Sequence, residues 1–252
     1  MREPDFFEIA KWDSEFFGFP VGKVLATTLS EAAVSALPGW AKENRIRCLY
    51  FLCDSEAESS FIAARALGFD LVDIRLTFRC DLAISETELG GGHSGLHVDF
   101  FETFDPAVLE PMSRDAFSQS RFYSDFHFDR KRAGDLYTTW LAQDCQRGEP
   151  GAGVVVAKID GKIAGYVTLR SLSRECAAIG LVCVGEEFRG KGVGDGMLAF
   201  LRKRLLATGA REIEVVTQGK NSAARKLYER HRYRLAKTQV WHHLWFDPGT
   251  KR

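Results

Sequence analysis

Four glycines occupy alternate positions from Gly190 to Gly196, and Arg189 stands directly before the first of them. The apolar run over residues 176–184 precedes this segment, and the pattern after it predicts a helix. The first N–H groups of a helix have no acceptor within it, and the helix dipole adds positive charge there. Glycines let a phosphate approach the main chain closely, so the segment predicts a phosphate or pyrophosphate site. A glycine-rich helix start without a ligand is the simpler alternative, although glycine costs about 1 kcal/mol relative to alanine inside a helix.

Two well-known nucleotide loops fit this segment poorly. A P-loop requires GxxxxGK followed by Ser or Thr, whose hydroxyl binds magnesium. Gly185, Gly190 and Lys191 match that pattern, but the next residue is Gly192, which has no hydroxyl. A dinucleotide-binding fingerprint requires GxGxxG, and neither GxG pair here has the third glycine at that offset.

The pattern R-x-x-G-x-G from Arg189 to Gly194, between an apolar strand and a helix, resembles the acyl-coenzyme A loop of the GNAT N-acetyltransferases. The segment NSAARKLYERHRY, which starts at Asn221, resembles the asparagine, paired alanines and tyrosine that follow the next strand in that family. The chain departs from the family at Arg232-Tyr233, where members usually have Gly-Phe. The resemblance implies acetyl-CoA as co-substrate. It also implies that the coenzyme contacts Arg189, Gly190, Lys191, Gly192, Val193, Gly194 and Asn221.

The same resemblance implies direct attack of an amine on the thioester, which needs no covalent enzyme intermediate. Main-chain groups of the preceding strand, with Leu181, Val182 and Val184 as candidates, would contact the coenzyme and meet the charge on the thioester oxygen. Tyr228 would give a proton to the departing thiolate; packing as an aromatic residue on a helix face is its alternative role. Asp73 would take the proton from the amine through water, unless it is only an outward-facing residue of an alternating strand.

Three segments nearer the N-terminus, WDSEFFGFPVG (12–22), LGFDLVD (67–73) and QSRFYSDFHF (119–128), resemble the sugar-nucleotide branch of the GNAT family. The resemblance therefore covers nearly the whole chain and implies a dTDP- or UDP-linked amino sugar as the acceptor. Arg121, Phe122 and Tyr123 are the candidates on the acceptor side, because an arginine can bind a phosphate and aromatic rings can stack on a base or sugar. An ordinary amphipathic connection with core phenylalanines is the alternative.

The pattern of elements predicts an α/β (α+β) protein in which helices flank a mixed sheet. The resemblance implies a GNAT fold, whose sheet is largely antiparallel. The glycine-rich stretch at 90–95 predicts a linker between a smaller N-terminal α/β domain at 1–89 and a catalytic domain at 96–252. We expect helices at 31–45, 55–67, 105–117, 130–145, 192–208 and 221–231. We expect strands at 46–54, 69–82, 95–103, 176–184, 211–218 and 234–246, and a hairpin over 153–172 that turns at Asp160-Gly161.

The charge balance is neutral, with 34 basic and 34 acidic residues, which argues against nucleic acid or an anionic membrane as partner. The six cysteines form no CxxC pair and the histidines show no ligand spacing, so we expect no metal site. No run of about 18 apolar residues occurs, so we expect no membrane span and a cytoplasmic protein. The resemblance implies a homodimer. Two other functions stay open: a GNAT enzyme for another amine acceptor, and a non-catalytic acyl-CoA sensor.

Overall fold

The computed structural model describes residues 5–83, 95–114 and 116–246. The predicted linker at 90–95 therefore lies outside the described residues except for Gly95. The chain forms two compact units. Unit 1 comprises the residues up to Arg75, Ser120–Phe128 and the residues from Thr238 onward, and unit 2 comprises Leu76–Gln119 and Asp129–Lys237. These units differ in extent from the predicted domains 1–89 and 96–252, because two later segments of the chain return to unit 1.

Unit 1 is an α/β unit whose strands lie in the order β1-β2-β3-β10. Strand β3 is parallel to β2 and antiparallel to β10. Helix α2 begins after Ser30, whose hydroxyl accepts a hydrogen bond from the Ala33 N–H, and α3 ends at Gly68 in the left-handed conformation. The elements of unit 1 are β1 (Phe7–Ile9), α1 (Lys11–Phe17), β2 (Val21–Val24), α2 (Glu31–Glu43), β3 (Cys48–Asp54), α3 (Glu58–Leu67), α5 (Arg121–Ser124), and parts of β4 (Asp70–Asp81) and β10 (Arg234–Trp245).

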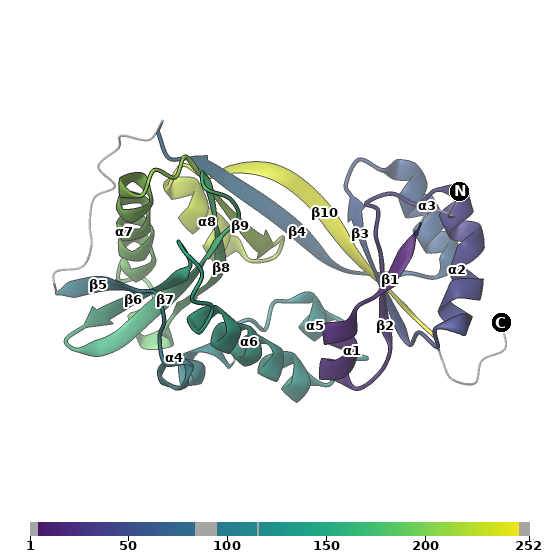
Figure 1. Ribbon diagram of the computed structural model, residues 1–252, viewed down its shortest axis with the longest axis horizontal. Helices are drawn as coiled ribbons and strands as arrows, with labels where there is room; N and C mark the ends of the chain where they lie inside the picture. Colours follow the sequence, from purple (N-terminus) through teal and green to yellow (C-terminus); the bar gives the residue numbers. More distant parts are fainter. Residues whose placement is uncertain (1–4, 84–94, 115, 247–252) are drawn as a thin grey trace. The chain divides into compact units, whose positions relative to one another are not determined.

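Unit 2 carries the strand order β4-β9-β8-β7-β6-β5, and Figure 1 shows α7 and α8 on one side of this sheet and α4 and α6 on the other. Strands β5, β6, β7 and β8 pair antiparallel in that order, whereas β8 and β9 are parallel. The remaining elements are β5 (Leu96–Phe101), α4 (Pro106–Ser113), α6 (Arg130–Cys145), β6 (Gly153–Ile159), β7 (Lys162–Ser171), β8 (Cys176–Val184), a 3-10 turn (Glu186–Phe188), α7 (Val193–Ala207), β9 (Glu212–Gln218) and α8 (Ser222–Arg230).

The fold confirms the expected GNAT architecture and each expected helix and strand, with boundaries that differ by a few residues. The hairpin turns at Asp160 and Gly161, which have φ of 50° and 76°, as a tight hairpin turn requires. Arg232 has φ of 64°, so it takes the left-handed conformation for which a glycine at this helix end would be better suited.

Within the described part of the chain, no helix has the length and apolar content needed to cross a membrane.

Candidate active site

Strands β8 and β9 pair along only part of their length. The parallel register runs from Cys176 opposite Glu212 to Ile179 opposite Val215. Strand β8 continues to Val184 and β9 to Gln218, so the two strands part after their fourth matched pair. Where parallel strands part, each presents main-chain N–H and C=O groups that the other no longer satisfies.

The direction of the β8 amides shows which residues face this opening. The N–H of Gly185 donates to the Ala164 carbonyl of the β7 side at 2.9 Å, and the N–H of Leu181 donates to Thr168 Oγ1 of β7 at 2.8 Å. Successive residues of a strand point their polar groups to opposite edges. Val182 and Val184 therefore direct their main-chain groups toward the β9 side, whereas the Leu181 amide is already bonded to β7.

The loop after β8 leads into the N-terminus of α7. Gly192 caps the helix with φ of 74°, and no side chain accepts a hydrogen bond at this cap. The first hydrogen bond of the helix runs from the Gly196 N–H to the Gly192 carbonyl at 2.9 Å. The Val193 and Gly194 amides precede it and have no acceptor within the helix. This uncapped start of a 15-residue helix fits the pyrophosphate of a coenzyme.

The other residues of the loop are consistent with this geometry. Gly190 has φ of 75°, and a Cβ atom added there would meet no atom within 4 Å, so it is the backbone conformation that favours glycine. Arg189 is exposed and lies 3.9 Å from Glu186. Lys191 Nζ lies 5.5 Å from the centre of the Phe188 ring. Both cations remain on the surface of the loop.

Helix α8 follows β9 and packs directly against the start of α7. A Cβ atom at Gly194 would lie 3.1 Å from Leu227 Cδ2, so the small residue permits close contact between the two helices. Asn221 caps α8, since its Oδ1 accepts a hydrogen bond from the Ala224 N–H at 3.1 Å. The cap accounts for Asn221 whether or not it also contacts a coenzyme.

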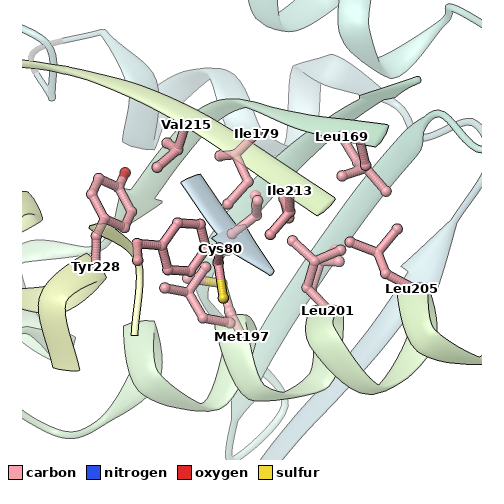
Figure 2. Packing of buried hydrophobic residues seen from close by; sticks show 14 of the residues in the cluster. Cys80, Leu169, Ile179, Met197, Leu201, Leu205, Ile213, Val215 and Tyr228 are labelled. Carbon is pink, nitrogen blue, oxygen red and sulfur yellow. The ribbon is translucent and has the colours of Figure 1, made fainter. Parts of the chain in front are cut away.

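Tyr228 belongs to the core of unit 2 and is only 3% exposed. Its ring lies 6.0 Å from that of Phe78 and 5.6 Å from that of Tyr233, between ring centres. Burial raises the pKa of the phenol above its usual value of 10. Among the described residues no hydrogen bond to its hydroxyl is present, and Figure 2 shows that hydroxyl pointing away from Met197. Tyr228 is thus both a core residue and a phenol that stays protonated at neutral pH.

Asp73 lies on β4 within unit 1 and is buried, with 8% of its surface exposed. Its Oδ1 accepts a hydrogen bond from the Ile74 N–H at 2.8 Å. The alternative of an outward-facing strand residue is therefore wrong, because the neighbouring Ile74 is the exposed one. A role for Asp73 as the base stays a prediction.

Arg121 has an ordered setting in unit 1. Its Nη1 lies 2.8 Å from His243 Nε2, and its guanidinium carbon lies 4.1 Å from the centre of the Tyr50 ring and 4.0 Å from that of Trp241. No carboxylate of the described residues lies within 4 Å of this guanidinium. Phe122 is a core residue with 1% exposure, so its ring has no free face for stacking.

His243, which contacts Arg121, is itself held by Asp125 in a buried pair that the sequence did not indicate. His243 Nδ1 lies 2.7 Å from Asp125 Oδ2, which also accepts a hydrogen bond from Trp245 Nε1 at 2.8 Å. Burial lowers the pKa of His243 to about 4, despite the hydrogen bond to Asp125. The neutral ring therefore donates from Nδ1 to Asp125 and accepts from Arg121 at Nε2. Asp125 and His243 lie 118 residues apart in sequence, so no local motif marks them.

The cysteines offer no nucleophile at the opening. All six are free, and Cys183, between Val182 and Val184, is buried. Burial raises the pKa of the Cys183 thiol to about 12. The thiolate is the nucleophilic form, and it is scarce at neutral pH under these conditions. Across residues 5–83, 95–114 and 116–246, no group of three His, Cys, Asp or Glu side chains could hold a metal ion.

Comparisons with known proteins give a family match and several relatives. Residues 116–233 match the Acetyltransferase (GNAT) family. The chain is 26% identical to the dTDP-fucosamine acetyltransferase of Escherichia coli O6:H1 over 91% of this chain and 94% of that protein. It is 29% identical to the spore coat polysaccharide biosynthesis protein SpsD of Bacillus subtilis (strain 168) over 59% of this chain, and the match spans only 50% of that relative. A GCN5-related N-acetyltransferase from Sphaerobacter thermophilus shares the fold, with a TM-score of 0.66 and 16% identity over 98% of this chain and 78% of that one.

Proposed function

We propose that this chain transfers the acetyl group of acetyl-CoA to the amino group of a nucleotide-linked amino sugar, because residues 116–233 match the Acetyltransferase (GNAT) family and a relative along 91% of the chain is a dTDP-fucosamine acetyltransferase. The observation that carries the proposal is the parting of β8 and β9 beside an uncapped helix N-terminus. Strand β8 supplies unpaired amides for the amide-bearing pantetheine arm of a coenzyme. The N-terminus of α7 supplies amides and a helix dipole for its pyrophosphate. Such a pair suits an acyl-CoA better than a free nucleotide.

On the coenzyme side, the GNAT family uses acetyl-CoA. The Val193 and Gly194 amides would bind its pyrophosphate, with Gly190 and Gly192 shaping the loop and Arg189 and Lys191 adding positive charge. The Val182 and Val184 main chain would bind the pantetheine arm and stabilise charge on the thioester oxygen. When bound, the coenzyme supplies an activated acetyl group.

Two side chains are proposed to move protons. The Tyr228 hydroxyl would donate a proton to the thiolate, and burial favours this role because it keeps the phenol protonated. The Asp73 carboxylate would take the proton from the attacking amine through a water molecule. The high pKa of Cys183 supports direct attack rather than an acyl-enzyme, since this thiol is a poor nucleophile.

On the acceptor side, the proposal draws on the relatives and on Arg121. One relative is named for a dTDP-linked amino sugar and the other for polysaccharide biosynthesis. Arg121 is half-buried and held by His243 and three aromatic rings, with no carboxylate of the described residues at contact distance. A guanidinium in such a setting can bind a phosphate without reorganising. Tyr123, which is half-buried, remains the second acceptor-side candidate.

The experiment is an acetyl-transfer assay of the purified chain with acetyl-CoA and a panel of acceptors. The panel contains dTDP- and UDP-linked amino sugars, amino acids, polyamines and a lysine peptide, and free thiol and product mass are measured. The expected result is transfer to a nucleotide-linked amino sugar, lowered in Asp73→Asn and in Arg121→Gln. Transfer only to another amine would favour the alternative GNAT function. Binding of acetyl-CoA without turnover on any acceptor would favour a sensor.

The same proposal places the reaction in the cytoplasm, with the protein acting as a homodimer. Light scattering on the purified chain measures the oligomeric state, and a monomer at all concentrations would contradict that part of the proposal.

A further inference from the structure

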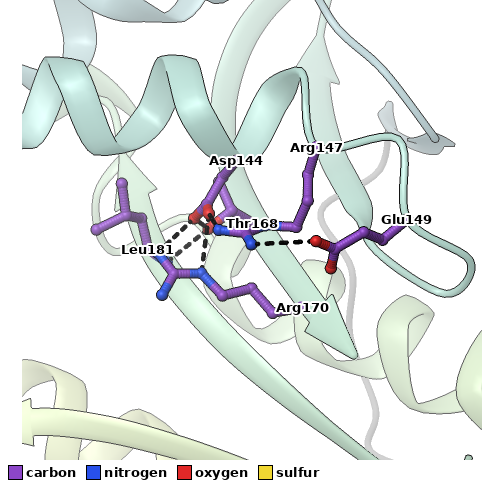
Figure 3. A network of polar contacts seen from close by, with 6 residues as sticks. All are labelled: Asp144, Arg147, Glu149, Thr168, Arg170 and Leu181. Atoms are coloured by element: carbon purple, nitrogen blue, oxygen red, sulfur yellow. Dashed lines mark hydrogen bonds and ion pairs between the residues drawn. The ribbon is translucent and has the colours of Figure 1, made fainter. Parts of the chain in front are cut away.

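The carboxylate of Asp144, at the end of α6, is completely buried, and the proposed reaction does not use it. Figure 3 shows the contacts that satisfy it. Arg170 Nε donates to Oδ1 at 2.8 Å and its Nη2 donates to Oδ2 at 3.1 Å. Arg147 Nη2 donates to Oδ1 at 3.0 Å. Two guanidinium groups thus offset the charge of a carboxylate that is removed from water.

Asp144 also accepts a hydrogen bond from a hydroxyl that holds strand β8. Thr168 Oγ1 on β7 lies 2.7 Å from Asp144 Oδ2, and the Leu181 N–H donates to the same Oγ1 at 2.8 Å. Since the amide can only donate, the hydroxyl accepts from Leu181 and gives its own hydrogen to Asp144. A continuous chain of hydrogen bonds therefore links the buried carboxylate to the main chain of β8.

The chain of hydrogen bonds ends at a β-bulge. The register of β7 and β8 pairs Val167 with Val182 and Leu169 with Ile179. Thr168 alone therefore stands opposite two residues of β8, which are Gly180 and Leu181. A bulge bends its strand and increases the local twist. Ile179 is also the last residue of β8 that pairs with β9, so the bulge begins where the two strands part.

Gly180 makes room for this arrangement. A Cβ atom at Gly180 would lie 2.5 Å from Thr168 Oγ1 and 2.7 Å from Asp144 Oδ2. Both distances are shorter than any side chain tolerates, so the glycine is required by close packing of polar atoms against the strand. The bulge, the hydroxyl and the carboxylate form one packed unit, which we call the Asp144 anchor (Asp144, Thr168, Gly180 and Leu181).

We propose that Asp144 is a positioning residue, which acts through Thr168 and the Leu181 amide to hold the bulge that turns β8 away from β9. This inference rests on the proposed function, because the residues after the bulge are Val182 and Val184, whose amides are assigned to acetyl-CoA. The anchor fixes where those amides point. Removing the hydroxyl leaves the buried Leu181 N–H without its acceptor and takes away one of the two hydrogen bonds that Asp144 Oδ2 accepts, so the strand relaxes toward pairing with its neighbours.

The test compares two variants at one position. Thr168→Val replaces the hydroxyl by a methyl group of similar size, and Thr168→Ser keeps the hydroxyl. Thr77→Val is the matched control for loss of a buried hydroxyl, since Thr77 lies buried on β4 and makes no hydrogen bond to a described residue through its side chain. Kinetics are measured with acetyl-CoA and the acceptor varied separately. Amide hydrogen exchange over residues 179–185 is followed by mass spectrometry without coenzyme.

For Thr168→Val we expect a loss of about 10²-fold in kcat/KM for acetyl-CoA, because displacement of a positioning group by about 1 Å has an effect of this size. The KM of the acceptor should stay unchanged, and exchange at 179–185 should be faster. Thr168→Ser and Thr77→Val should behave as wild type in each measurement. Asp144→Asn should reproduce the Thr168→Val pattern.

Three results would overturn the inference. If Thr168→Val binds and uses acetyl-CoA as wild type does, the anchor has no positioning role, although the proposed function stands. If neither Thr168→Val nor Asp144→Asn folds, the network is a requirement of the fold and not a positioning device. If the wild-type chain itself fails to bind acetyl-CoA in calorimetry, the proposed function falls and the positioning role falls with it.

Discussion

Replacement of Tyr228 by phenylalanine removes only the hydroxyl group, so it tests the catalytic role of that group while the packing of the ring is kept. The ring keeps its contacts with Phe78 and Tyr233, and the hydroxyl that is lost has no hydrogen-bond partner among the described residues. The free energy of unfolding should therefore change by less than about 1 kcal/mol, since no hydrogen bond is broken. If Tyr228 donates a proton to the thiolate, kcat should fall by about 10²- to 10⁴-fold.

The assay follows thiol release at saturating acceptor, with acetyl-CoA binding measured by calorimetry and unfolding by circular dichroism. Burial raises the pKa of Tyr228 above 10, so the phenol stays protonated and the loss should be the same between about pH 6 and 9. Tyr233→Phe is the control, because Tyr233 is buried in the same core. Equal kcat values for Tyr228→Phe and Tyr233→Phe would refute the assignment of Tyr228 as the acid.

Three further changes have expected outcomes. The folded chain keeps His243 neutral down to about pH 4, whereas the unfolded chain protonates it below about pH 6.5. Unfolded chains thus bind more protons between these two pH values, and the free energy of unfolding should fall by about 3 kcal/mol for this group as pH drops from 6.5 to 4. Urea unfolding followed by tryptophan fluorescence should show that the free energy of unfolding depends less on pH in His243→Asn. An unchanged slope would contradict the buried neutral ring. Gly194→Leu should lower stability by about 1–3 kcal/mol because it forces α7 away from Leu227 of α8. Gly194→Ala should stay within about 1 kcal/mol of wild type. Equal melting temperatures for the two variants would count against the close contact between these helices. Asn221→Ala removes the cap of α8 and should cost about 1 kcal/mol, which Asn221→Asp should restore; thermal melts decide this, and a neutral Asn221→Ala would show that the cap contributes nothing.

The elements that the sequence predicts well are those with a local physical signal. Strand β8 is predicted with its observed bounds by a continuous apolar run, and α6 is also predicted with its observed bounds. In the structure the side chain of Asp129 caps α6, since it accepts a hydrogen bond from the Arg132 N–H. Helices α1 and α5 are missed, because α1 has seven residues and no buried side chain, and α5 has four. Short elements of this kind are set by tertiary packing.

In the candidate site, too, the features with a local sequence signal are predicted and those that depend on distant residues are not. The loop from Arg189 to Gly194 and the cap Asn221 are visible in sequence, because glycine spacing and capping act between near neighbours. The link from Asp144 through Thr168 to Leu181 is not, since the residues lie 24 and 13 positions apart and belong to a helix and two strands. Only the register of β7 and β8, which the sequence does not specify, brings them together.

The return of the last strand to unit 1 has a consequence for synthesis on the ribosome. Strand β3 pairs with β10 from Asp54 opposite Gln239 to Cys48 opposite Trp245, so one edge of β3 is complete only when residues 239–245 have emerged. All residues of unit 2 are made before Thr238. Strand β3 must therefore wait for β10 until all of unit 2 has been made, and during that interval its open edge is where a chaperone would be needed.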